Sequence, residues 1–495
     1  MADVTKTDCR PARWMAPLVL AMLCGVAAYS DSFRGPFIFD DIDAIVNNPQ
    51  VNRALTASHA PVPTTLSGRP VLRATFAIDY AIGGMRVEVY HLTNLLIHLA
   101  SGVVLFAIVR QNLSSERNWG NRFSQSAHWL AGAVCAVWLV HPLNTEAVSY
   151  TVQRAESLAG LFYLLVIYCV IRNWKLAAVA ACAMGLGTKE MVATAPLVAL
   201  IYDRTFLSGS FAAALKARRG LYIALAATWV IPVAVTLSGS RSASVGGLLP
   251  LDYVRTQAGV IAHYVALSIW PSRLVLDYYD WPIVQSWGNF SVGALLVVVS
   301  ILLFLISLGW KPWLGFLGIW FFLILAPSSS VLPIFTEIAA EHRMYLPIMA
   351  PVVLVVVGGW AVLARSRAGA WIAGLLLTIL LAALSARTFL RNAEYQDPES
   401  IWADNVAQRP MNPRAHFNLG YTLLTANRPA EAAHEFRTAL ELDPNYYAAD
   451  RELGRALLLS REANLEEGRL RAARGDAQGA EADFQAVTRP DGQTP

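Results

Sequence analysis

Charged side chains are scarce in this 495-residue chain. Asp, Glu, Lys and Arg make up only 15% of it, whereas 55% of the residues are hydrophobic and the mean hydropathy is +0.43. Soluble domains carry about 25% charged residues, so the composition excludes a purely soluble protein and predicts a membrane protein. The net charge of +4 gives no broad basic field, so the sequence gives no argument for nucleic acid and we expect none as a partner.

Cysteine is also scarce, with five residues in the whole chain. Four of them lie in apolar runs, and no two have the spacing of a metal-binding or redox motif. This pattern excludes a disulfide framework and a zinc site, and it predicts small buried hydrophobic side chains.

Long apolar segments are abundant, and a membrane-spanning helix needs about 20 mostly apolar residues. We interpret the first segment as an uncleaved anchor, although the basic residues before it and the small residues after it also fit a signal peptide. The sequence predicts 11 spans, at Trp14–Tyr29, Tyr90–Val109, Trp129–Val140, Leu158–Ile171, Leu176–Gly187, Met191–Tyr202, Leu221–Leu237, Val292–Leu308, Trp313–Leu325, Leu346–Leu363 and Ala370–Leu384.

The distribution of Lys and Arg predicts the orientation. These residues are denser in the connections that lie inside if the N-terminus is cytoplasmic, which is the usual bias. The same rule favours a break at Lys189-Glu190 over one long helix through Leu176–Tyr202. We interpret the polar segment Tyr253–Trp270 as lying on or dipping into the outer face, because a span there would put the acidic loop Asp277–Asp280 inside.

The last hundred residues are polar and show a 34-residue period. Gly420, Ala432, Phe436, Ala439 and Pro444 have the spacing of a tetratricopeptide repeat, a pair of antiparallel helices. The pattern restarts at Leu453-Gly454 and then slips, which indicates a truncated second repeat or an extended first helix. The predicted domains are 1–389 in the membrane and 390–495 as an extracytoplasmic repeat tail.

An acidic pair, Asp40-Asp41, lies in the first outer loop. Adjacent carboxylates repel, so one of them can hold its proton near neutrality. Such a pair suits a general base toward a hydroxyl, or a divalent cation as cofactor. A solvated acidic turn or a helix cap is the alternative interpretation. The predicted orientation also places Arg154, Lys189 and Arg343 on the outer side, where cations beside a carboxylate pair suit a lipid-linked phosphate donor.

Several motifs occur in a fixed order along the chain. They are Gly35–Asp41, Arg69-Pro70, Ile82–Gly84, Tyr90–His98, His141–Val148, Arg154–Glu156, Lys189-Glu190 and Glu341–Pro347. Together they resemble the transmembrane O-mannosyltransferases with tetratricopeptide repeats, and the resemblance spans most of the chain. The repeat tail is shorter than in animal members, and the short loops suggest a bacterial relative in the inner membrane.

The resemblance implies an all-α polytopic fold of GT-C type with about 11 transmembrane helices. It also implies transfer of a mannose-like hexose from a polyprenyl-phosphate carrier to hydroxyl groups of a protein acceptor, with inversion at the sugar. In this scheme Asp40 or Asp41 is the base, with Asp41 favoured, and Arg154, Lys189 and Arg343 bind the donor phosphate. The supporting residues are His141, Glu146, Glu190, Glu341, His342 and Arg69.

Two other functions fit parts of the sequence. A non-catalytic membrane scaffold would use the repeats to recruit an envelope protein, but it would not need Asp40-Asp41 beside a set of cations. A transporter would place polar residues deep in several spans, whereas these spans hold few beyond Asn94, His98 and the Lys189-Glu190 break.

Overall fold

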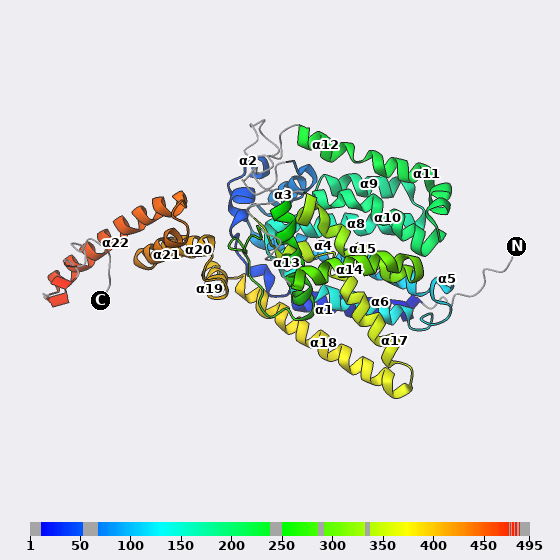
Figure 1. Cartoon of the computed structure of the whole chain (residues 1–495). Helices are drawn as coiled ribbons and strands as arrows, with labels where there is room; N and C mark the ends of the chain where they lie inside the picture. The colour runs from blue at the N-terminus through cyan, green and yellow to red at the C-terminus, as the bar shows by residue number, and fades with distance from the viewer. Residues whose placement is uncertain are drawn as a thin grey trace. The chain divides into compact units, whose positions relative to one another are not determined.

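The computed structural model describes residues 11–52, 68–237, 250–285, 292–331, 337–474 and a few positions up to 485. Within these ranges the chain is helical and contains no β-strand, as the sequence predicted. Figure 1 shows α8, α9 and α10 near one another, and α8 contacts both α9 and α10.

The helices of the membrane part vary widely in length. They are α1 Pro11–Ala28, α2 Pro49–Asn52, α3 Pro70–Gly83, α4 Val87–Leu113, α5 Glu116–Trp119, α6 Ala127–Leu139, α7 Thr145–Ser149, α8 Arg154–Arg172, α9 Lys175–Leu186, α10 Ala195–Tyr202, α11 Phe211–Ala227, α12 Val230–Leu237, α13 Pro250–Ile269, α14 Val292–Trp310, α15 Pro312–Ala326, α16 Met349–Val353, α17 Gly359–Leu363 and α18 Arg367–Glu394. Short 3-10 and π turns join several of them.

Seven helical segments of the described chain are long and apolar enough to cross a membrane, and the sequence predicted each of them. Three further predicted spans are shorter apolar helices, namely Ala127–Leu139, Lys175–Leu186 and Met349–Leu363. The remaining one, Met191–Tyr202, contains the eight-residue helix α10. The polytopic membrane fold is therefore confirmed, while the count of 11 spans stays a prediction.

The helix is interrupted between α9 and α10, as the Lys/Arg distribution predicted. Helix α9 ends at Leu186, and Lys189 has the extended backbone angles φ −153° and ψ 146° before the 3-10 turn Glu190–Thr194. The segment is therefore not one long helix. This break brings Lys189 to the beginning of α8, where the candidate site lies.

Small residues let the membrane helices approach closely. A Cβ atom on Gly132 of α6 would lie 2.6 Å from Pro17 of α1, and one on Gly160 of α8 would lie 2.6 Å from the ring of Tyr345. Close contact through small residues is a common way for helices to pack where no water drives them together. It fixes the beginning of α8 against the segment that carries His342 and Arg343.

The chain divides into two compact units. One comprises Met1–Leu274 and Ile283–Gln396, and the other comprises Val275–Pro282 and Asp397–Pro495. The change of composition near residue 390 does not indicate that Val275–Pro282 groups with the tail.

The second unit contains α19 Pro398–Gln408, α20 Pro413–Thr425, α21 Pro429–Leu442 and α22 Tyr447–Ala473. Helices α20 and α21 form the predicted repeat, and a Cβ atom on Gly420 would lie 2.9 Å from the Phe436 ring, so a small residue is needed there. After it, α22 continues for 27 residues, so the extended first helix is the correct alternative. Ala480 and Phe484, which the slipped pattern included, lie outside the described residues.

Candidate active site

The acidic pair follows a strained turn. Phe39 has φ 46°, a left-handed backbone conformation that a bulky residue rarely adopts, and its ring stacks on Tyr150. Strain of this kind tends to occur at functional sites, where the surrounding structure enforces it. The next residue, Asp40, is half-buried, and its backbone N–H donates to the Tyr150 hydroxyl at 2.9 Å.

Asp41 is placed differently from its neighbour. It is fully buried, and its two carboxylate oxygens accept hydrogen bonds from the backbone N–H groups of Val152 (2.6 Å) and Ile38 (3.2 Å). Burial raises the pKa of Asp41 to about 8, and the charge of Asp40 raises it too, while these amide hydrogen bonds oppose the rise. Asp41 therefore ties the turn to the beginning of α8, and Asp40 is the more exposed of the two carboxylates.

Tyr150 connects the acidic turn to the rest of the candidate site. Burial raises the pKa of its phenol well above the ordinary value, and the negative charges of Asp40 and Asp41 raise it further. The charge of Glu337 acts on the same phenol. The acidic turn and the segment around Glu337 thus lie within electrostatic reach of one side chain.

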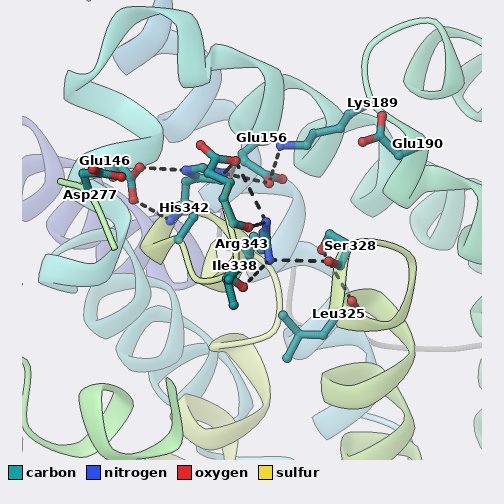
Figure 2. A network of polar contacts seen from close by, with 12 residues as sticks. Glu146, Glu156, Lys189, Glu190, Asp277, Leu325, Ser328, Ile338, His342 and Arg343 are labelled. Carbon is teal, nitrogen blue, oxygen red and sulfur yellow. Dashed lines mark hydrogen bonds and ion pairs between the residues drawn. The ribbon is translucent and has the colours of Figure 1, made fainter. Parts of the chain in front are cut away.

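A second part of the site, which we call the histidine network, comprises Glu146, Glu156, Lys189, His342 and Arg343, which Figure 2 labels, together with Glu337. The imidazole Nδ1 of His342 lies 2.7 Å from Glu146 Oε1, and the backbone N–H of His342 donates to Glu146 Oε2 at 2.8 Å. This double contact fixes the ring, and it turns Nε2 toward Glu156 Oε1 (3.9 Å) and Glu337 Oε2 (3.8 Å).

Lys189 reaches the same carboxylate from the other side. Its Nζ donates to Glu156 Oε1 at 2.7 Å, and the other oxygen of Glu156 is buried without a hydrogen-bond partner in the described structure. A buried polar atom left without a partner is costly and calls for an explanation. Glu156 therefore lies between Lys189 and His342, and one of its oxygens is left for a further contact.

Arg343 is held mainly by backbone carbonyl groups. It donates to Ile338 O at 3.1 Å and to the carbonyl of Glu337, and it lies 3.9 Å from the Glu337 carboxylate. With 31% of its side chain accessible, Glu337 is the most exposed member of the histidine network, and the sequence did not single it out. Glu341, adjacent to His342, is buried at 1% exposure.

Arg154 differs from Arg343 because its partners are mainly side chains and include a carboxylate. It is completely buried and forms a 2.6 Å ion pair with Asp79. Its Nε donates to Asn94 Oδ1 at 2.5 Å, its Nη2 donates to the Tyr90 carbonyl at 3.0 Å, and its guanidinium lies over the Phe76 ring. These contacts join α3, α4 and α8. The predicted phosphate contact is not favoured by a guanidinium so fully engaged.

Arg69 and His141, two of the predicted supporting residues, differ from each other in exposure and in charge. Arg69 lies 3.6 Å from Glu190, and both side chains are partly accessible, at 20% and 15%. His141 accepts from the Leu143 N–H through Nδ1, and burial lowers its pKa to about 4. His141 is therefore neutral and caps the turn before α7, whereas Arg69 remains a cation that a ligand can approach.

The residues of the acidic turn do not suit the predicted divalent cation. Within the described ranges, no three His, Cys, Asp or Glu side chains gather in a way that could hold a metal ion. Both oxygens of Asp41 already accept backbone hydrogen bonds. A cation at Asp40-Asp41 stays a prediction that this geometry does not favour.

Sequence reasoning missed some members of the site because their role depends on distant partners. Asp79 was visible only as one acidic residue in a helix, yet it neutralises Arg154. Tyr150 gave no signal at all, although it contacts the acidic turn. Glu156 lies two residues after Arg154, in the motif Arg154–Glu156. Its charge within an apolar helix was the signal that could have marked it as a site residue.

Comparisons with known proteins find similarity to one repeat family and to several membrane enzymes. Residues 413–446 match the tetratricopeptide repeat model. The chain is 25% identical to the human protein O-mannosyl-transferase TMTC1, over 88% of this chain and 56% of the relative. It is 22% identical to the Caenorhabditis elegans protein O-mannosyl-transferase F38B6.6, over 87% and 63%, and 25% identical to human TMTC4, over 83% and 64%.

The chain thus spans between 56% and 64% of the length of these relatives. As the ordered motifs predicted, the chain is similar over most of its length to protein O-mannosyl-transferases, among them human TMTC1 and TMTC4.

Proposed function

We propose that this chain is a membrane glycosyltransferase that moves a mannose-type hexose from a polyprenyl-phosphate carrier to a hydroxyl group of a protein. The names of its relatives support the reaction class. The observation that carries the proposal is the accessible Asp40 at a strained turn, within reach of the incompletely paired histidine network through Tyr150.

Asp40 is the proposed general base. It takes the proton of the acceptor hydroxyl while that oxygen bonds to the anomeric carbon of the sugar. The bond from the anomeric carbon to the phosphate oxygen breaks on the opposite face, and the polyprenyl phosphate leaves with the electron pair. Asp41 positions this base, because its buried carboxylate anchors the turn through two backbone N–H groups.

Lys189, Arg343 and Arg69 are the proposed contacts of the donor phosphate. Lys189 and Arg343 belong to the histidine network, in which Glu156 lacks a hydrogen-bond partner for one oxygen. Arg69 is the most accessible cation of the three. Cations placed at a leaving phosphate stabilise the charge that develops as the bond to the sugar breaks. Arg154 instead holds α3, α4 and α8 together.

We further propose that the reaction occurs on the extracytoplasmic side of a bacterial inner membrane, with a cytoplasmic N-terminus and an extracytoplasmic repeat tail. The Lys/Arg distribution supports this orientation. A phosphatase reporter fused after Pro495 tests it: activity outside the cell is expected. An inactive phosphatase fusion together with an active cytoplasmic reporter at the same position would overturn the orientation.

The function itself is tested by an assay in membranes that contain the chain. Several polyprenyl-phosphate sugars, each labelled in the sugar, are offered with candidate protein acceptors, and transfer of label to protein is measured. Transfer by the wild type and none by Asp40→Asn/Asp41→Asn is expected. If the double variant transfers sugar like the wild type, the chemistry lies elsewhere and the scaffold function takes its place.

A further inference from the structure

The repeat unit holds a non-helical segment of the chain that turns between Tyr278 and Trp281, where the Trp281 N–H donates to the Tyr278 carbonyl at 3.0 Å. This segment, Val275–Pro282, forms one compact unit with Asp397–Pro495, and we call it the cis segment. The Asn405 side chain of α19 grips its backbone. The Asp277 N–H donates to Asn405 Oδ1 at 2.9 Å, and Asn405 Nδ2 donates to the Asp277 carbonyl at 3.2 Å. This contact uses only main-chain groups of the bound segment, so it does not depend on the side chain that the segment carries at this position.

The carboxylate of Asp277 is recognised as well. Arg414 donates to both of its oxygens, with Nε at 2.9 Å from Oδ2, and Asn412 Nδ2 donates to Oδ2 at 3.0 Å. Asp277 is only 4% exposed. Two-point contact of an arginine with a carboxylate is strong and specific in direction, so this position of the cis segment requires an acidic side chain.

A second acidic position follows three residues later. Arg409 Nε donates to Asp280 Oδ1 at 2.6 Å. The guanidinium of Arg409 lies over Tyr278, at 5.2 Å from the ring centre, and over Trp281 at 5.6 Å. Cation–π contact at such distances favours aromatic side chains beside the acids. The recognised pattern of the cis segment is an aspartate, two tyrosines, a second aspartate and a tryptophan, at residues 277–281.

The residues that make these contacts are close together in the sequence. Asn405, Arg409, Asn412 and Arg414 all come from the end of α19 and the beginning of α20, and we call them the arginine–asparagine face. A peptide that binds this face does not need any other part of the repeat for its polar contacts. The face thus has the parts of a peptide-binding site: a main-chain clamp and two cations at fixed separation.

We propose that the arginine–asparagine face binds a segment of a partner protein with the pattern acid, two aromatics, acid, and that the cis segment occupies this site until the partner displaces it. Segments joined by short flexible tethers act as ligands at about millimolar effective concentration. A free peptide therefore competes poorly in the wild type and well once the cis segment is weakened. The inference concerns protein binding and is independent of sugar transfer, so its failure leaves the proposed function intact.

The test measures binding of a fluorescent peptide with the sequence of residues 274–283 to the full-length protein in detergent. The variant Asp277→Asn/Asp280→Asn weakens only the internal competitor and leaves the arginine–asparagine face unchanged. It should bind the peptide at least tenfold more tightly than the wild type. Arg414→Gln added to this variant should abolish binding, and a control peptide with both aspartates replaced by asparagine should not bind. Equal binding by the wild type and the folded variant would overturn the proposal.

A second measurement keeps the proposal testable if the variant does not fold. Hydrogen exchange of the wild type is compared with and without millimolar peptide, a concentration set by the tether argument. The backbone N–H of Asp277, which is protected by Asn405, should exchange faster when the peptide is present. Unchanged exchange throughout the cis segment would show that this segment is a permanent part of the unit and would overturn the proposal.

Discussion

Two charged clusters at the beginning of α8 differ in how completely their charges are paired. At Arg154, each of the three guanidinium nitrogens donates a hydrogen bond, and Asp79 balances the charge. Two residues later, Glu156 has an oxygen without a hydrogen-bond partner in the described structure, and His342 lies 3.9 Å away without a hydrogen bond (Figure 2). Two buried charged clusters so close in sequence therefore differ in whether their cation is fully hydrogen-bonded and whether their carboxylate has an oxygen left for a further contact.

The largest expected effect on stability concerns the fully paired cluster. Replacing Arg154 by methionine leaves Asp79 as an uncompensated buried charge, and loss of one partner of such a pair costs about 3–5 kcal/mol. Unfolding of the purified protein should show this loss, whereas the donor KM of the fraction that remains folded should stay near the wild-type value. Arg86→Gln, an exposed control, should change neither quantity. A large rise in donor KM without loss of stability would make Arg154 a phosphate ligand after all.

Removing charge from the histidine network should affect binding more than folding. In Glu156→Gln/Lys189→Met both partners of the ion pair become neutral, so neither charge is left buried and alone. We expect stability close to that of the wild type and a donor KM raised about tenfold, which corresponds to about 1.4 kcal/mol. Donor titration at saturating acceptor measures this change. An unchanged donor KM in the folded double variant would exclude Lys189 as a phosphate contact.

The pH dependence of stability should report on Asp41. Its folded-state pKa of about 8 is above the ordinary value of an aspartate, so the buried carboxyl favours the folded state when protonated. This contribution is complete below about pH 4 and is lost as the pH rises toward 8. Thermal unfolding between these pH values should therefore show a smaller loss of stability for Asp41→Asn than for the wild type. Parallel curves for the two proteins would contradict the raised pKa.

The smallest expected effect belongs to the partly exposed pair of Arg69 and Glu190. Their side chains are 3.6 Å apart, and such pairs contribute at most about 1 kcal/mol to stability. Glu190→Gln should leave the unfolding temperature nearly unchanged. Because it removes an anion beside a proposed phosphate contact, it should lower the donor KM a few-fold. A higher donor KM would indicate that Glu190 positions Arg69 and does not compete for it.

Periodicity predicted the parts of the fold that depend on neighbouring residues. Apolar runs gave the membrane helices, and the spacing of Gly420, Ala432 and Phe436 gave the repeat, because these residues meet within one helical hairpin. The pairing of Arg154 with Asp79 could not be derived in this way. It depends on how α3 and α8 approach each other, and no local pattern encodes that approach.

The same limit applied to the acidic pair and the repeat unit. The sequence did not distinguish Asp40 from Asp41 as the base, although Asp41 was favoured, because two adjacent aspartates look alike without their surroundings. The buried backbone contacts of Asp41 distinguish the two residues. Likewise, Asp277 is far from Arg414 in the chain, and only the folded unit brings its carboxylate to the beginning of α20.

The most direct test of the account is a comparison of turnover in Asp40→Asn and Asp41→Asn, each purified, shown to be folded and assayed at saturating donor and acceptor. General-base catalysis is typically worth about 10²–10⁴-fold. The account predicts that Asp40→Asn loses turnover by that factor with donor binding retained, and that Asp41→Asn mainly changes stability and its pH dependence. Near wild-type turnover in Asp40→Asn, together with loss of turnover in a stable Asp41→Asn, would contradict it.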